Sequence, residues 1–321
     1  MQLFPSRISY LLIFIVTAIN LIWLSNAAIT LPLEQLFRPA LVLATLTALV
    51  VTLDRMTYSS GRIALICSKF SYLFQGMIFL QISWISVRLF NHISMTSAFP
   101  YTDETLLKWD GLIGLSWERY FHAVQSNSLI NTIMGYSYIS LTFFSFLGFL
   151  ILSLQGDLRR TRFFLETFLF TAVICTGIGM FFPAKAAVAM YYGDAKTLAN
   201  LDALPGVYHI EAMERLRSGA AFALDLNDLP GLVTFPSFHT AAGVILVISF
   251  WRTALFPIIL AYSGIMIAST PVLGGHYFVD LIAGTAVAAL VAWAFGSLPV
   301  YRGMFAQPGT EPGAVRPATS G

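Results

Sequence analysis

Long runs of apolar residues, separated by short polar stretches, dominate this chain. About 20 consecutive apolar residues are needed to cross the hydrocarbon layer of a membrane as an α-helix. Runs of this order recur along most of the chain, without an internal repeat. They predict an all-α, polytopic transmembrane helical bundle of about eight segments, at residues 8–24, 36–53, 70–90, 129–154, 163–182, 238–256, 257–274 and 277–298.

The first two runs need separate comment. Arg7, the apolar stretch after it and Ser25-Asn26-Ala27 have the layout of a secretory signal peptide cleaved after Ala27. The apolar stretch is long for a signal, so we expect an uncleaved helix. The second run is short, and Pro39 near its start suits the first turn of a helix.

Composition agrees with a membrane location. Of the 321 residues 57% are hydrophobic and 11% are charged, whereas about 25% of the residues of a soluble domain are charged. The mean hydropathy is +0.75. A net charge of +2 is too small to indicate nucleic-acid binding. Cys67 and Cys175 lie in or beside apolar runs without metal-ligand neighbours, so we expect neither a structural disulfide nor a metal site there.

Basic residues predict the orientation of the chain. They concentrate in the connections after the second, fourth, sixth and eighth runs, which all fall on one side of an eight-helix bundle. Basic loops mark the cytoplasmic side, so both termini are expected there and the long loops 91–128 and 183–232 on the opposite side. The residues concerned are Arg55, Arg62 and Lys69, then Arg159, Arg160 and Arg162, then Arg252, and then Arg302.

Two polar motifs lie where predicted segments begin. The first is Thr234-Phe235-Pro236-Ser237-Phe238-His239-Thr240, and the second runs from Ser269 to Asp280 as Ser-Thr-Pro-Val-Leu-Gly-Gly-His-Tyr-Phe-Val-Asp. Ionisable side chains in apolar runs are costly and are therefore candidates for a functional site. Both motifs open onto the non-cytoplasmic side, so the topology alone brings His239 and His276 to one membrane face.

The residue types in these motifs suit phosphoryl transfer. If a helix begins near Gly275, then His276 and Asp280 lie at i and i+4 on one face of it. Asp280 can accept the proton of one imidazole nitrogen and leave the other nitrogen free as a nucleophile. Pro236 suits a first helical turn, Ser237 offers a hydroxyl there, and helix N-termini attract phosphate. Either histidine alone would read equally well as a helix-end residue; the paired arrangement favours a site.

Pro-Ser-x-His, followed some thirty residues later by Ser-x6-His-x3-Asp, resembles the type-2 phosphatidate phosphatase superfamily. Phe-Pro-Ser-Phe-His-Thr and Gly-Gly-His-Tyr-Phe-Val-Asp look most like its inositol phosphorylceramide synthase branch and the bacterial relatives of that branch. The resemblance is dense from about residue 181 to 296. It implies a six-helix phosphatase-type core, a lipid phosphate or phospholipid as substrate, and a mechanism that requires no metal and no cofactor.

The resemblance also implies a role for each motif residue. His276 attacks phosphorus and becomes phosphohistidine, and Asp280 orients and charge-stabilises it. His239 protonates the leaving alkoxide, and Ser237 holds a phosphate oxygen. Phe238 and Gly275, within the same motifs, count as substrate-binding residues.

Two basic positions of the superfamily pattern are missing. The Arg that follows the Ser of the last motif is Thr270 here, and Lys-x6-Arg-Pro becomes Lys185 followed by Tyr192-Gly193. Such basic groups clamp phosphate in the phosphatases. Their absence puts simple phosphatase activity in doubt and fits the synthase branch better. Lys185 itself stays a candidate substrate-binding residue.

The long loops carry further candidates. Residues 108–121 alternate apolar and charged positions and contain two tryptophans, which predicts a helix lying in the membrane interface as an anchor rather than a substrate guide. A second helix at about 208–224 makes Glu211 and Arg215 an i,i+4 ion pair. Arg217, close to the first histidine motif, is the better candidate to touch phosphate, although an ordinary surface charge is its simpler role.

The remaining polar segments have plain interpretations. Asp225 and Asp228 could form a paired-carboxylate metal site, but with Asn227 they read as a turn, and we expect no metal. No nucleotide-binding loop is present, so the expected donor is a lipid rather than ATP. The tail at 301–321 is rich in Pro, Gly, Thr and Ala and is expected to be disordered and cytoplasmic.

These observations define a hypothesis and its rivals. We expect N-terminal membrane helices at 1–62 and a catalytic domain at 63–300 that transfers a phosphoryl group or phospho-headgroup between lipids, at the periplasmic face of a bacterial inner membrane. A lipid phosphate phosphatase is the alternative. A transporter without catalysis would need polar groups at mid-membrane, and a vanadate-dependent haloperoxidase would need the missing arginines. The oligomeric state does not follow from the sequence.

Overall fold

The computed structural model describes residues 4–57, 61–193, 206–301 and 303–304, and it is all-α apart from one short strand pair. Strands β1 (Ile29–Thr30) and β2 (Phe222–Ala223) pair in parallel. Most of the predicted tail, 305–321, lies outside the described residues. The helices are α1 (Arg7–Asn26), α2 (Phe37–Met56), α3 (Arg62–Ile93), α4 (Asp103–Leu112), α5 (Trp117–Gln125), α6 (Ser128–Ile139), α7 (Leu141–Gln155), α8 (Leu158–Gly179), α9 (Ala187–Tyr192), α10 (Ile210–Arg217), α11 (Phe238–Ser249), α12 (Phe256–Leu273) and α13 (Phe278–Gly296).

The apolar helices identify an integral membrane protein. Within the described residues, six helices are long and apolar enough to cross a membrane, and a seventh crossing results if α6 and α7 form one span bent by 54°. The bend falls at Ser140, whose hydroxyl donates to the carbonyl of Ser137. The predicted sixth segment, 238–256, is shorter in the structure, because α11 ends at Ser249 and the chain then turns into α12.

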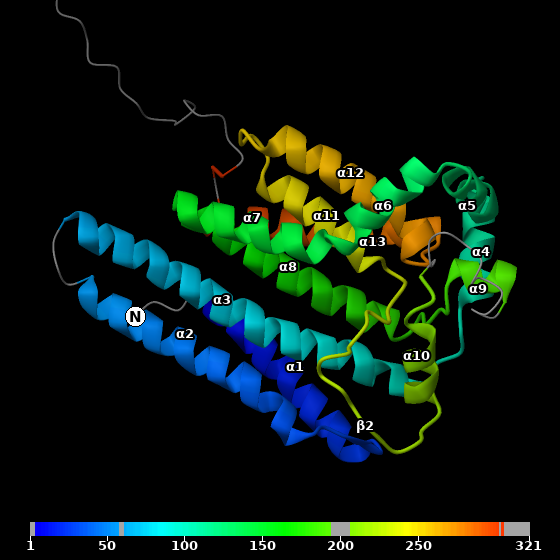
Figure 1. Ribbon diagram of the computed structural model, residues 1–321, viewed down its shortest axis with the longest axis horizontal. Helices are drawn as coiled ribbons and strands as arrows, with labels where there is room; N and C mark the ends of the chain where they lie inside the picture. Colours follow the sequence, from blue (N-terminus) through cyan, green and yellow to red (C-terminus); the bar gives the residue numbers. More distant parts are fainter. Residues whose placement is uncertain (1–3, 58–60, 194–205, 302, 305–321) are drawn as a thin grey trace, which may run out of the picture.

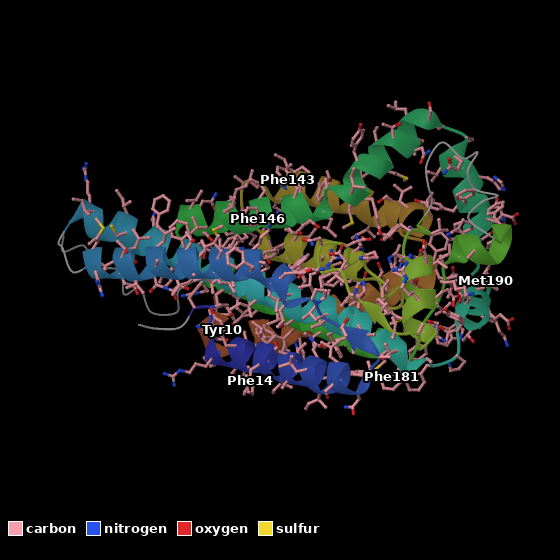
Figure 2. The ribbon with its side chains drawn as sticks, turned by 60° about the horizontal axis from the view of Figure 1, so that its bottom comes forward. Tyr10, Phe14, Phe143, Phe146, Phe181 and Met190 are labelled. Carbon is pink, nitrogen blue, oxygen red and sulfur yellow. The ribbon has the colours of Figure 1, made fainter. Side chains whose placement is uncertain are left out.

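Large apolar side chains cover the outside of the bundle. Phe14 of α1 and Phe143 of α7 are 68% and 63% exposed and point outward from opposite faces, as Figure 2 shows. In the most apolar stretch of the segment Leu33–Met56, which contains α2, only 11% of the residues are buried. Exposed apolar surface of this extent is typical of a lipid-facing exterior.

Helix α8 forms the centre of the bundle and packs against α3, α7, α11 and α13. In lipid the hydrophobic effect adds little to helix association, so close packing at small residues becomes important. Gly284 of α13 meets the backbone of Ser237, where an added Cβ would lie 2.3 Å from the carbonyl oxygen. At Gly243 of α11 the side chain of Met266 occupies the space that a Cβ would need. These contacts bring α11, α12 and α13 close together.

The two ends of the bundle differ in character. At one end Arg160 donates to the carbonyls of Ser249, Trp251 and Met304, so three of the basic connections meet there. At the other end the short helices α4, α5, α9 and α10 gather (Figure 1). The predicted interfacial helix at 108–121 is wrong in detail, because these residues belong to two helices, α4 and α5. Trp117 is fully buried, and its indole donates to the carbonyl of Pro271.

Candidate active site

Both histidine motifs meet at the end of the bundle capped by the short helices. The first motif leads into α11, and the second connects α12 to α13. The backbone N–H of Ser237 donates to the carbonyl of Asp280 at 3.0 Å, so the motifs are joined directly. Gly284, one turn further along α13, leaves room for this contact.

His276 is held by Asp280 within one motif. Its Nδ1 lies 3.2 Å from Oδ2 of Asp280, and both residues are almost completely buried. The helix begins at Phe278 and not near Gly275, so His276 lies outside α13 and Asp280 reaches back to it from the first turn. The same carboxylate oxygen accepts the N–H of Tyr277 at 2.9 Å, which stabilises this helix start.

The other ring nitrogen of His276 faces Ser237. Its Nε2 lies 3.3 Å from the hydroxyl oxygen of Ser237, which also accepts the N–H of Thr240 as the N-cap of α11. Pro236 therefore precedes the N-cap. The prediction that it lies in the first helical turn is wrong. Because Ser237 accepts from Thr240, its own proton can point to Nε2, which fits a His276 tautomer with its proton on Nδ1, towards Asp280.

His239 approaches the same place from α11. Its ring stacks on that of Tyr138 at 4.5 Å and 14°, and its centroid lies 6.3 Å from that of His276. The hydroxyl of Tyr138 pairs with that of Tyr208 at 3.0 Å. The two imidazoles are therefore close enough to act on one bound group, and His239 is positioned largely by aromatic contact.

A tight backbone turn places His276. Gly275 has a φ of +69°, which favours glycine, and an added Cβ would lie 2.7 Å from both Ala186 Cβ and the carbonyl oxygen of Gly206. The carbonyl of Gly275 accepts the N–H of Ala187 at 3.0 Å. Gly275 thus serves as a packing position as well as a candidate binding residue.

Two aspartates of α4 support this turn from outside the motifs. Asp110 accepts the N–H groups of Phe278 and Val279, both at 2.9 Å. Asp103 accepts the Tyr277 hydroxyl at 2.9 Å and the N–H of Lys185 at 3.0 Å. Burial raises the pKa of Asp110, while its two N–H donors act in the opposite direction. The N-terminus of α13 is thus already paired with a carboxylate, and the prediction that it offers free N–H groups to a phosphate is wrong.

A cavity of about 980 Å³ opens from the histidines into the bundle. Its wall contains His239, His276 and Phe238 at one end and mainly apolar side chains of α2, α3, α7 and α8, with a few polar ones, along the rest. Phe238 is held by an edge contact with Phe168 at 5.2 Å. The cavity therefore joins a polar head to a long apolar body, the shape that a lipid substrate requires.

Of the five predicted substrate-binding residues, only Phe238 is among the described residues that form the cavity wall. Ser237 and Gly275 lie next to His276 but are not part of the wall. Lys185 and Arg217 have other partners. Lys185 pairs with Glu214 at 2.6 Å and lies over the ring of Tyr101. Arg217 donates to the carbonyl of Phe99 at 2.6 Å and also stacks on Tyr101, at 4.1 Å. Neither is among the residues that form the cavity wall.

The other loop predictions can be located as well. Arg215 and Glu211 form the expected ion pair at 2.9 Å on α10, which is shorter than the predicted helix. Asp225 accepts the N–H of Asn227 at 2.9 Å, which is turn geometry. No group of three metal-ligating side chains occurs among the residues that the structure describes.

Burial lowers the pKa of both His276 and His209. Loss of solvation lowers the pKa of His276 to about 4, against a smaller opposite effect of a hydrogen bond to the backbone of Thr234. Burial, followed by the charge of His276, lowers the pKa of His209 to about 4. At neutral pH the ring of His276 therefore carries a lone pair on one nitrogen, as a nucleophile needs.

Sequence reasoning missed several residues of this site. Asp103, Asp110 and Tyr277 are joined by contacts across more than 160 residues of chain, for which no local pattern exists. Arg88 and His209 line the cavity beside the two motif histidines. Arg88 had a signal, because it is an isolated charge within the predicted segment 70–90.

Fold and site together define an integral membrane protein with two histidines at the head of an apolar cavity. The chain belongs to the PAP2 superfamily, since the model of that family matches residues 104–294, more than half of the chain. Members are phosphatases or phosphotransferases, which supports a phosphatase-type enzyme acting on lipid phosphates in membranes. Comparisons with curated proteins and with solved structures returned no match.

Proposed function

We propose that this protein transfers a phosphoryl group or phospho-headgroup from one lipid to another, with His276 as the nucleophile. The observation that carries the proposal is the pairing of His276 with Asp280 at 3.2 Å, with His239 across the same cavity, 6.3 Å away between ring centroids. A carboxylate that holds one imidazole nitrogen leaves the other free to attack.

The proposed reaction has two steps. Nε2 of His276 forms a bond to phosphorus while the bond from phosphorus to the leaving oxygen breaks. His239, in its imidazolium form, gives a proton to the departing alkoxide and becomes neutral, and Asp280 stabilises the positive charge that develops on His276. His239 then removes a proton from the acceptor hydroxyl, whose oxygen takes the phosphoryl group from His276. We assign to the hydroxyl of Ser237, 3.3 Å from Nε2 of His276, the role of holding a phosphate oxygen during both steps.

Charge in the cavity favours transfer over simple hydrolysis. Among the described residues of its wall, Arg88 is the one side chain with a permanent charge. A phosphodiester carries one negative charge, whereas a phosphomonoester carries close to two at neutral pH. A single cation therefore fits a diester donor better, and a phosphatase acting on a monoester is the alternative that the experiment must separate.

The apolar body of the cavity supports a lipid as the substrate. Val42 and Leu46 of α2 reach its wall, together with Met77 and Leu80 of α3. We propose that these N-terminal helices, within 1–62 and the start of 63–300, help to hold the acyl chains while 63–300 carries the chemistry.

A screen for lipid products tests the reaction. Purified protein is incubated with phosphatidic acid or with inositol-containing phospholipids, each with and without an added lipid alcohol, and the products are analysed by mass spectrometry. We expect a new phospholipid that forms only when both donor and acceptor are present. Release of inorganic phosphate from phosphatidic acid, unaffected by the acceptor, would instead identify a phosphatase.

We further propose a periplasmic site in a bacterial inner membrane, from the basic connections at the opposite end. Ser218 lies on the histidine side and Ser297 follows α13 on the other side, and both are exposed. Cys67 and Cys175 are buried and should react little. Ser218→Cys should react with an impermeant thiol reagent in intact cells and Ser297→Cys should not. The reverse pattern would place the site in the cytoplasm.

A further inference from the structure

The polar head of the cavity contains one group that the histidine motifs do not supply. Arg88 lies near the end of α3, before the residues that match the family model, and lines the cavity with His239 and His276. One of its N–H groups donates to the carbonyl of Leu229. A guanidinium has five N–H donors, so this bond leaves most of its capacity unused.

The surrounding residues direct Arg88 towards the site. Trp84, Arg88 and Asn91 lie at i, i+4 and i+7, on one face of α3. Arg88 packs over the ring of Trp84 at 5.5 Å, and Asn91 accepts the N–H of Leu232 at 2.9 Å. This face of α3 thus supports the segment that leads into the first motif and holds a cation beside it.

Two buried polar atoms at the same end of the cavity, one on His209 and one on Thr234, have no hydrogen-bond partner among the described residues. His209 is 1% exposed and Thr234 is 3% exposed, and both line the cavity. Neither Nε2 of His209 nor the hydroxyl oxygen of Thr234 has a hydrogen-bond partner among the described residues. Buried polar groups in folded proteins are nearly always paired, so these two atoms are available to a polar ligand at this end of the cavity.

We propose that Arg88 and the hydroxyl of Thr234 bind the phosphate of the substrate. This rests on the proposed function. They supply the contacts that the superfamily pattern places at basic positions occupied here by Thr270 and by Tyr192-Gly193. The guanidinium pairs with two phosphate oxygens, and Thr234 donates to one of them. The nucleophile and the phosphate-binding cation thus come from helices far apart in sequence.

The free-energy cost of placing the charge of Arg88 inside the bundle also argues for a ligand. A charge within a membrane-spanning helix is expensive unless it is paired or hydrated. Its bond to the Leu229 carbonyl could be made by a neutral donor, and no carboxylate is among the described residues that line the cavity. A phosphate would supply the missing negative charge.

Binding of inorganic phosphate to the purified full-length protein tests the proposal without requiring turnover. Isothermal titration calorimetry should give a dissociation constant for the wild type that rises about tenfold to a hundredfold in Arg88→Gln. Arg88→Lys should lie between the two, because it keeps the charge but loses the paired geometry. Thr234→Val should weaken binding a few-fold. Unchanged binding in Arg88→Gln would overturn the proposal.

Two control variants separate binding from indirect effects. Arg215→Gln removes the same charge from the exposed ion pair with Glu211 and should bind phosphate like the wild type. Asn91→Ala removes the other bond that holds the 229–232 segment and should reduce binding less than Arg88→Gln does. An equal loss in Asn91→Ala would show that Arg88 acts only by holding that segment, and it would refute the phosphate contact.

The outcomes for the two proposals can be told apart. If Arg88→Gln weakens phosphate binding but no lipid donor yields a product, then the phosphate site stands and the proposed reaction fails. If the transfer reaction is found, we expect Arg88→Gln to raise the KM for the lipid donor at least tenfold. A normal KM together with normal phosphate binding would leave the reaction standing and remove Arg88 from the site.

Discussion

His276 and His239 face the same cavity but are held by different interactions. His276 has polar partners on both ring nitrogens, Asp280 at 3.2 Å and Ser237 at 3.3 Å. His239 is held by its stack on Tyr138 at 4.5 Å. A nucleophile must keep one tautomer and one direction, whereas a residue that first gives and then takes a proton needs freedom at its nitrogen. The contrast supports our proposal that His276 makes the covalent attack and His239 transfers the proton.

The largest expected effect separates these two roles. His276→Ala should be inactive on every phosphoester, because no substrate can bypass the nucleophile. His239→Ala should lose about a hundredfold to ten-thousandfold on a lipid, whose alkoxide is a poor leaving group. A nitrophenolate leaves without a proton. Brief incubation with a labelled nitrophenyl ester should therefore leave acid-labile label on His239→Ala and none on His276→Ala. Label on His276→Ala would reverse the assignment.

The next effect concerns the partner of His276. Asp280→Asn keeps the shape of the side chain but can present an N–H to Nδ1, which would favour the wrong tautomer. The comparable change in a serine protease lowers turnover about ten-thousandfold. We expect a large loss of this order in phosphoenzyme formation, with normal expression and helix content. Activity within a few-fold of the wild type would make Asp280 a helix-capping residue only.

A smaller effect tests the aromatic support of His239. Tyr138→Leu removes the stacked ring and should slow lipid turnover about twofold to tenfold, since such contacts contribute about 0.5–1.5 kcal/mol. Tyr138→Phe keeps the ring and serves as the matched control, although it loses the bond to Tyr208. Neither variant should change the rate at which the nitrophenyl ester labels His276. An equal loss in both would point to the hydroxyl pair instead of the stack.

The smallest expected effect is that of pH on the rate of ester labelling, which should hardly change near neutrality. Because burial lowers the pKa of His276 to about 4, it stays neutral at and above pH 5. The kcat/KM of ester labelling should therefore be flat from pH 8 to about 5 and fall as the pH drops through about 4. A midpoint near 6.5, the ordinary value for histidine, would show that the nucleophile is solvated.

Burial of His276 and His209 also predicts the sign of a stability change. In the unfolded chain both take up protons near pH 6.5, whereas in the folded protein they do so only near pH 4. The unfolded state thus binds more protons between these values, and the free energy of unfolding should decrease on acidification from about pH 6.5 to 4. Thermal unfolding in detergent of the wild type and of His209→Gln, measured at several pH values, checks this. The variant should lose less stability across that range.

The sequence was sufficient to predict most of the helices and one contact between the motif residues. Apolar runs of about 20 residues have one stable solution in a membrane, so most segments were predicted within a few residues. The i,i+4 spacing of His276 and Asp280 also predicted their contact, although the helix starts later than expected. Local spacing determines such features, and it can be read from the sequence.

Contacts between distant segments could not be read in the same way. Asp110 pairs with Phe278 and Val279, which follow it by more than 160 residues, and nothing near Asp110 indicates its partners. Trp117 looked like an interfacial anchor because its alternating pattern also suits a buried helix end. Arg88 is different, because its position within an apolar run was a signal that had not been used.

The hydrogen bonds of Arg160 have a consequence for the order in which the helices assemble during synthesis. Its guanidinium donates to carbonyls of Ser249, Trp251 and Met304, which are synthesised about 90 to 145 residues later. While the ribosome is still extending the chain, these donors must be satisfied by water or lipid headgroups. The end of the bundle around Arg160 can therefore close only after α13 has been made, so a segment that follows α13 completes the packing at the start of α8.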